Sequence, residues 1–195
     1  MRKCFIVLIS LFCFLPSVLN AEVESLDLLE TLKDEGIETS IDYKENDTQT
    51  TVYMFRTKGE EKCIEFLNYL NDIYEQYGEF FKVRTYEVSL NEDNKLLMDN
   101  TIDYLSSEVN TTPFMVIGST YFITYNESIN HNFEKTFIEY YLSGSSVDTI
   151  DEVLTRYYRN DTLIMTIFLS ILILIPVGIV VISVKNKLEN RNTKE

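Results

Sequence analysis

The sequence predicts an α/β domain with a mixed sheet, joined to one transmembrane helix near the C-terminus. Three patterns in the 195-residue chain support this prediction. Apolar segments lie near both ends of the chain, and strand-like and helix-like segments alternate between them. Two short apolar runs on either side of a turn come after this alternation and before the C-terminal apolar segment. Strands that alternate with helices indicate a parallel βαβ unit, and the two runs add an antiparallel hairpin.

The first apolar segment has the order of a secretory signal peptide. Arg2 and Lys3 precede an apolar core at 5–15, and the small residue Ala21 stands at the expected cleavage point. This core is short for a bilayer span, which needs about 20 residues. We therefore expect residues 1–21 to be a cleaved signal peptide, and the alternative is an uncleaved anchor.

The second apolar segment, residues 163–184, contains no charged residue. At about 1.5 Å per residue its length is about 33 Å, which is enough to cross the hydrocarbon core of a bilayer. The tail that follows, residues 185–195, is rich in Lys and Arg, and basic flanks are retained in the cytoplasm. These patterns predict a single-pass cell-membrane protein with an extracytoplasmic N-terminal domain and a cytoplasmic tail.

The exported part is acidic and poor in cysteine. The chain has 17 Lys+Arg and 31 Asp+Glu, of which 11 and 29 lie outside the signal and the tail. Such a surface repels nucleic acid. Cys4 and Cys13 belong to the expected signal, so Cys63 alone remains and no internal disulfide is expected. His131 is the single histidine. We therefore expect no metal site and no cofactor.

Hydrophobic periodicity predicts the elements between the two apolar segments. Residues 22–50 are expected to form an N-terminal helix and a connection, and residues 51–158 the extracytoplasmic domain. Strands are expected at 51–55, 81–90, 114–117 and 121–125, and helices at 63–78, 91–108, 132–142 and 147–158.

This order, with Thr112-Pro113 opening the hairpin, resembles the thioredoxin fold. The segments FKVRTYEVSLNEDNKLLMDN and TTPFMVIGSTYF are similar to membrane-associated, thioredoxin-like proteins of Gram-positive bacteria. The resemblance covers roughly residues 51–141. It implies that Pro113 is the family's cis-proline and that Thr112 offers main-chain groups to an extended substrate. A cis bond is cheap only before proline. The alternative is an ordinary proline at the start of a strand.

The family's redox site is a Cys-x-x-Cys motif after the first strand of the fold. The same register places Cys63 at the second cysteine and Glu60 at the first, so that the motif reads Glu60-Glu61-Lys62-Cys63. The resemblance therefore implies that the attacking thiol is lost. Cys63 is either a reactive thiol or an inert, packed side chain. The two glutamates are either catalytic carboxylates or the acidic residues favoured in the first turn of a helix.

Together these patterns predict a redox-degenerate module that holds extended protein segments near the membrane in a groove at Thr112 and Pro113. The alternative is a thiol-disulfide oxidoreductase that works through Cys63 alone or with a thiol of a partner. A third hypothesis is an accessory subunit of a membrane complex, with the transmembrane helix in the interface. The expected partners are exported proteins or extended segments, and not nucleic acid.

Overall fold

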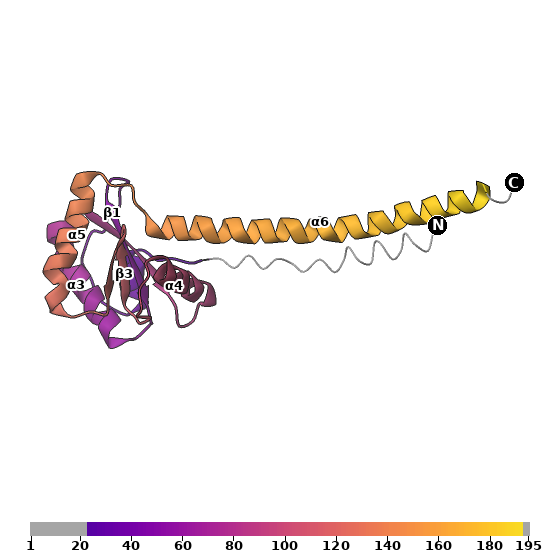
Figure 1. The fold of residues 1–195 in the computed structure, drawn as a ribbon. Coiled ribbons are helices and arrows are strands. Elements are labelled where there is room, and N and C mark those ends of the chain that lie inside the picture. The colour runs from indigo at the N-terminus through magenta and orange to yellow at the C-terminus, as the bar shows by residue number, and fades with distance from the viewer. Residues whose placement is uncertain (1–22, 193–195) are drawn as a thin grey trace.

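The computed structural model describes residues 23–192, which form an α/β domain followed by one long helix (Figure 1). The expected signal peptide, residues 1–21, lies outside the described residues. The elements are, in order, α2 (Leu28–Asp34), β1 (Thr50–Arg56), α3 (Glu61–Tyr77), β2 (Phe81–Glu87), α4 (Glu92–Tyr104), β3 (Phe114–Ile117), β4 (Thr120–Ile123), the 3-10 turn η1 (Glu127–Ile129), α5 (Asn130–Ser143) and α6 (Thr149–Asn192).

The four strands form one mixed sheet in the order β2-β1-β3-β4. β1 and β2 are parallel, whereas β3 is antiparallel to both β1 and β4. The predicted parallel βαβ unit and antiparallel hairpin are therefore confirmed.

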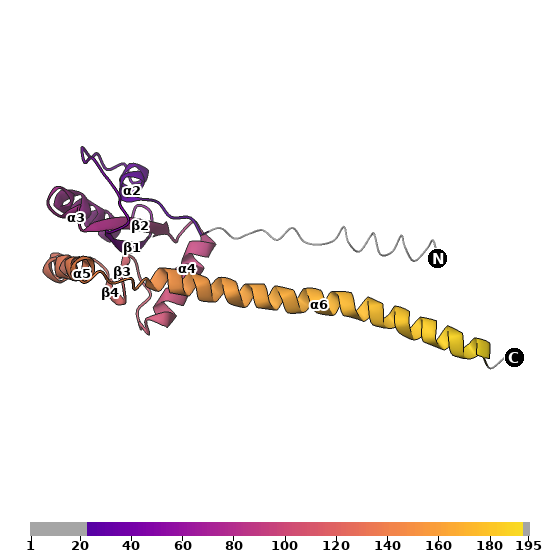
Figure 2. The same ribbon diagram turned by 90° about the horizontal axis from the view of Figure 1, so that it is seen from above.

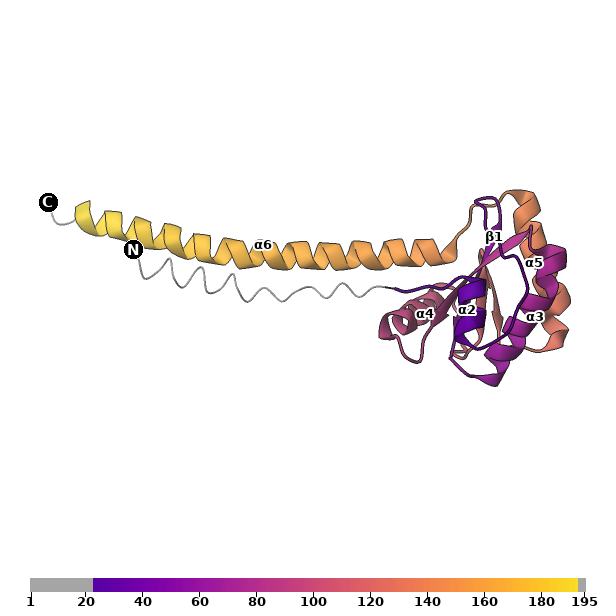
Figure 3. The ribbon, with the colours of Figure 1, turned by 180° about the vertical axis from the view of Figure 1, so that it is seen from behind.

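Helices cover both faces of this sheet. α3 and α5 lie on one face, and α4 and the first turns of α6 lie on the other (Figures 1 and 2). Each face has its own core of buried apolar side chains. α2 lies beside the sheet between α3 and α4, and its buried Leu28 and Leu32 extend the first core (Figure 3).

α3 has the buried face that its sequence spacing predicts. Leu67, Leu70 and Tyr74 recur every three or four residues, and they are buried together with the adjacent Phe66, as expected for one side of an α-helix. The helix ends at Tyr77 and Gly78 is its C-cap, in agreement with the predicted glycine stop.

Two of the predicted elements end several residues earlier than expected, because the chain turns before the apolar pattern ends. β2 ends at Glu87 and not at Leu90, because the Glu87 carboxylate accepts hydrogen bonds from the N–H groups of Ser89 (2.8 Å) and Leu90 (2.7 Å) and turns the chain. α4 ends at Tyr104 and not at residue 108. Two residues later Ser106 has a φ of 54°, which a continuing right-handed helix does not allow.

The hairpin turn between β3 and β4 needs its glycine for two reasons. Gly118 has a φ of +55°, and a Cβ atom there would lie 1.9 Å from the Tyr140 ring. The Tyr140 hydroxyl in turn accepts a hydrogen bond from the Ser119 N–H (2.9 Å), which anchors α5 to the turn. The close approach of α5 therefore depends on a residue without a side chain.

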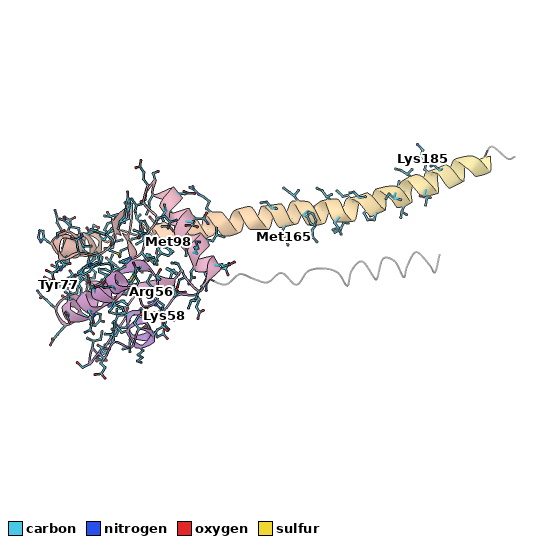
Figure 4. The ribbon with its side chains drawn as sticks, turned by 90° about the horizontal axis from the view of Figure 1, so that it is seen from below. Arg56, Lys58, Tyr77, Met98, Met165 and Lys185 are labelled. Atoms are coloured by element: carbon cyan, nitrogen blue, oxygen red, sulfur yellow. The ribbon has the colours of Figure 1, made fainter. Side chains whose placement is uncertain are left out.

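α6 joins the predicted helix at 147–158 and the predicted span at 163–184 into one uninterrupted helix. Its first turns belong to the domain, since Ile150 and Val153 are buried in the second core. Its stretch Ile164–Asn186 has a mean hydropathy of 3.0 and is long and apolar enough to cross a membrane. Met165 and Lys185, labelled in Figure 4, mark how far this stretch extends beyond the domain.

Candidate functional site

The antiparallel pairing of β1 and β3 creates the candidate site. Phe55 of β1 lies opposite Phe114 of β3, so the loop after β1 and the residues before β3 meet at the same end of the sheet. The loop 57–60 carries Glu60, and the chain before β3 carries Thr112 and Pro113. The structure thus brings together residues that are more than 50 positions apart in the sequence.

Glu60 is the centre of this group. Its Oε2 atom accepts a hydrogen bond from the Thr112 hydroxyl and another from the Cys63 thiol, whose Sγ lies 3.1 Å away. The hydroxyl oxygens of Thr112 and Thr57 are 3.0 Å apart. The peptide bond between Thr112 and Pro113 is cis. All four residues predicted for the site, Glu60, Cys63, Thr112 and Pro113, therefore lie side by side.

Glu60 directly precedes α3, but its side chain does not cap the helix. Glu60 is the N-cap residue, with extended backbone angles and no hydrogen bond from its carboxylate to the first turn. The carboxylate is directed across the loop to Thr112 and Cys63 instead. Glu61, by contrast, is exposed in the first turn, where an acidic side chain interacts favourably with the helix dipole.

Cys63 is a buried and protonated thiol. Its side chain is 0% exposed, and burial raises its pKa to about 12, with the hydrogen bond to Glu60 and the negative charge of Glu60 acting in the same direction. Contacts with the Thr57 main chain and the Thr112 hydroxyl oppose this shift without cancelling it. A thiol must ionise before it attacks a disulfide. At neutral pH this environment holds Cys63 in its unreactive form.

Sequence reasoning missed Arg56, which directly precedes the loop. Its side chain is only 1% exposed, and its guanidinium pairs with Asp34 at 2.7 Å and with Glu35, both at the C-terminal end of α2. The Glu35 carboxylate also accepts a hydrogen bond from the Gly59 N–H (3.0 Å). α2 thereby holds the loop that carries Glu60.

The alternation of side chains along β1 could have indicated that Arg56 is buried. Alternate residues of a strand share one face, and Arg56 has the same parity as the buried Val52 and Met54. That parity directs its side chain toward the face on which α2 packs. Figure 4 shows Arg56 within the body of the domain, with Lys58 beside it.

Two cavities lie near these elements, and neither contains Cys63. One of about 280 Å³ lies beside Arg56 and Lys58, and also touches Thr85 and Asn94. The larger one, of about 830 Å³, is lined by residues 40–49 and 74–79 at the opposite end of β1. In the part of the chain that the structure describes, no group of three His, Cys, Asp or Glu side chains is placed to hold a metal ion. His131 is exposed at the start of α5.

Comparisons of the chain with known protein families, with curated proteins and with solved structures find no match. Its function is therefore argued from the chemistry of the residues at the site.

The pKa of Cys63 predicts slow alkylation. At pH 8 the folded chain should react with iodoacetamide at Cys63 on the order of a thousandfold more slowly than the unfolded chain, whose thiol has a pKa near 8.5. Mass spectrometry of the peptide that contains Cys63 measures both rates. Glu60→Gln removes the negative charge but leaves Cys63 buried. The alkylation rate of Cys63 in this folded variant should therefore rise by roughly tenfold or less. Equal rates for the folded and unfolded wild type would contradict the prediction.

Proposed function

We propose that this chain is a membrane-anchored, extracytoplasmic, thioredoxin-like protein that lacks redox activity and binds extended protein segments. The observation that carries the proposal is the Glu60 carboxylate. It stands beside the cis-proline, where the family resemblance expects the attacking thiol, and it accepts a hydrogen bond from the thiol of the remaining Cys63.

The arrangement of the elements supports a thioredoxin-like fold. From β1 to α5 the order is strand, helix, strand, helix, strand, strand, helix. The turn after β1 faces a cis Thr112-Pro113 bond at the start of β3. This order and this proline are the features on which the resemblance rests.

The main chain of Thr112 supports the binding of extended segments. Within residues 23–192, its N–H and C=O make no hydrogen bond with another main-chain group. The C=O accepts only a long hydrogen bond of 3.5 Å from the Thr111 hydroxyl. The Thr112 side chain is held by Glu60 and Thr57. Val109, 45% exposed on the same approach to β3, adds an apolar contact. Free main-chain groups beside apolar side chains suit a partner in strand conformation.

The site offers little support for the alternative, a thiol-disulfide oxidoreductase. That activity requires a thiolate that reaches a substrate disulfide. Cys63 is 0% exposed and is the single free cysteine of the described residues. The Glu60 carboxylate that accepts its hydrogen bond is itself held by the Thr112 hydroxyl.

The expected orientation also belongs to this proposal. The apolar stretch of α6 is followed by Lys185 and further basic residues, which favour a cytoplasmic tail.

Loss of redox chemistry predicts inactivity of the wild type and partial recovery after one substitution. The full chain should not reduce insulin disulfides. Glu60→Cys should form a disulfide with Cys63 and gain modest activity, measured by insulin turbidity and by mass spectrometry. Glu61→Cys is the matched control, because Glu61 is exposed and residues two apart in a helix do not face each other. Turnover by the wild type, or a Glu60→Cys variant that never bridges, would refute this account.

The binding role predicts that Thr112 is needed for affinity. The full chain in nanodiscs should bind a reduced, carboxymethylated and therefore unfolded protein. Thr112→Val removes the hydroxyl that Glu60 holds, and the affinity should fall about five- to tenfold, the equivalent of roughly 1 kcal/mol. Thr111→Val removes only the long hydrogen bond that the exposed Thr111 hydroxyl donates to the Thr112 carbonyl, so it should not lower the affinity. Equal losses in both variants, measured by fluorescence anisotropy, would count against the groove.

The orientation predicts sensitivity to external protease. Protease added to intact cells should digest the domain and leave a small anchored fragment that an antibody against the C-terminus detects. A domain that resists digestion until the membrane is permeabilised would show that the orientation is reversed.

A further inference from the structure

We propose that β4 pairs with β4 of a second copy of this chain, so that one continuous antiparallel sheet runs across two subunits. The inference rests on the free edge of the sheet and on the direction of α6. It does not depend on the function proposed for the Glu60 site.

β4 forms an uncovered edge of the sheet. It is last in the strand order, and its four residues are all partly exposed, whereas the four residues of β3 are all buried. The opposite edge is different, because Leu26 forms a bridge with Thr85 of β2 and covers part of that strand. Of the two edges that the described residues form, β4 is thus the open one.

The register shows which main-chain groups of β4 are free. The Thr124 N–H donates to the Pro113 carbonyl (2.8 Å), and hydrogen bonding alternates along an antiparallel strand. Thr120 and Phe122 therefore direct their main-chain groups toward β3. Tyr121 and Ile123 direct theirs outward, where a further strand can bond to them.

This edge strand is short, with four residues, but it lacks two features that commonly prevent pairing. Proteins protect free edges with charged residues or proline. β4 has neither, and residues 109–126 contain no charged residue, in a chain of which 25% is charged and whose net charge is −14. Two acidic copies repel each other over most of their surface. The uncharged edge is where they approach with the least repulsion, which favours a second copy as the occupant.

Symmetric pairing about Phe122 satisfies the free groups. Tyr121 then lies opposite Ile123 of the partner subunit, and the two exchange N–H···O=C bonds in both directions. The two Phe122 residues then lie opposite each other across the symmetry axis, on the face that α3 and α5 cover, where each ring also packs against Phe133 of its own subunit. Tyr121 and Ile123 lie on the other face, with the second core. Aromatic and β-branched pairs of this kind stabilise neighbouring strands.

The direction of α6 makes this pairing compatible with a membrane. A symmetric continuation of an antiparallel sheet has its two-fold axis perpendicular to the sheet. α6 leads away from the face that α4 covers, rather than along the strands (Figures 1 and 2). Both copies of α6 therefore leave the same face in the same direction, as two chains anchored in one bilayer require. Ile150 and Val153 pack in one cluster with Tyr121 and Ile123, so each α6 begins near the paired edge.

A cysteine at the symmetry axis tests the register. In full-length chains with the three native cysteines replaced by serine, Phe122→Cys should form an inter-chain disulfide when membranes are oxidised with copper phenanthroline. The control is Ser119→Cys in the exposed hairpin turn, three residues from the axis. Two such residues lie about 20 Å apart in the paired sheet and should not bridge. A non-reducing gel measures both. Equal bridging, or none at residue 122, would overturn the proposal.

Removing one outward N–H tests the pairing without a cysteine. Tyr121→Pro deletes a donor that β3 does not use, and should convert a dimer to a monomer in light scattering of the detergent-solubilised full chain. Tyr121→Val keeps the N–H and should remain dimeric. A monomeric wild type at micromolar concentration, or a folded proline variant that stays dimeric, would reject the interface. If circular dichroism shows that the proline variant is unfolded, the cysteine experiment decides.

Discussion

The ion cluster around Arg56 constrains the rest of the domain. A guanidinium that is 1% exposed has lost almost all its hydration, and an unpaired charge at that depth is strongly destabilising. Asp34 and Glu35 supply the compensating charges, and the Thr85 hydroxyl accepts a further, longer contact of 3.4 Å. α2, β1 and β2 are therefore held together by one side chain. Because Glu35 also binds the Gly59 N–H, the cluster extends to the loop that carries Glu60.

The same loop shows how a carboxylate and a thiol differ at the start of a helix. A thiolate there is both an anion and a nucleophile, and the helix N-terminus stabilises it. Glu60 is an anion that accepts hydrogen bonds from two directions, which ties the loop to Thr112 and keeps the Cys63 proton in place. The hydrogen bonds of Glu60 thus hold the loop in place and at the same time oppose thiol-disulfide exchange at Cys63.

The sequence predicted those features that depend on spacing along the chain. The buried face of α3 follows from its period. The meeting of Glu60 with Thr112 was implied by the family resemblance instead, and the antiparallel pairing of β1 with β3 explains it. Contacts between distant polar groups were not predictable in this way. The parity of β1 directs Arg56 inward, but its charge suggests an exposed position, and only the packing of α2 supplies Asp34 and Glu35. The ends of β2 and α4 were missed for a related reason, because the Glu87 carboxylate and the backbone of Ser106 overrule the apolar pattern.

The uninterrupted α6 has a consequence for how the domain meets other molecules. Asp148 contacts Tyr53, and Glu152 and Arg156 contact Tyr104 of α4, so the base of the helix cannot swivel freely on the domain. Arg156 precedes Ile164 by eight residues, which is about 12 Å of helix. A domain on a flexible linker would explore a hemisphere above its anchor. In the membrane-spanning arrangement proposed above, this domain would instead move with its helix as one unit and stay in a thin layer parallel to the bilayer. It would then meet only those molecules that reach the same height above the membrane.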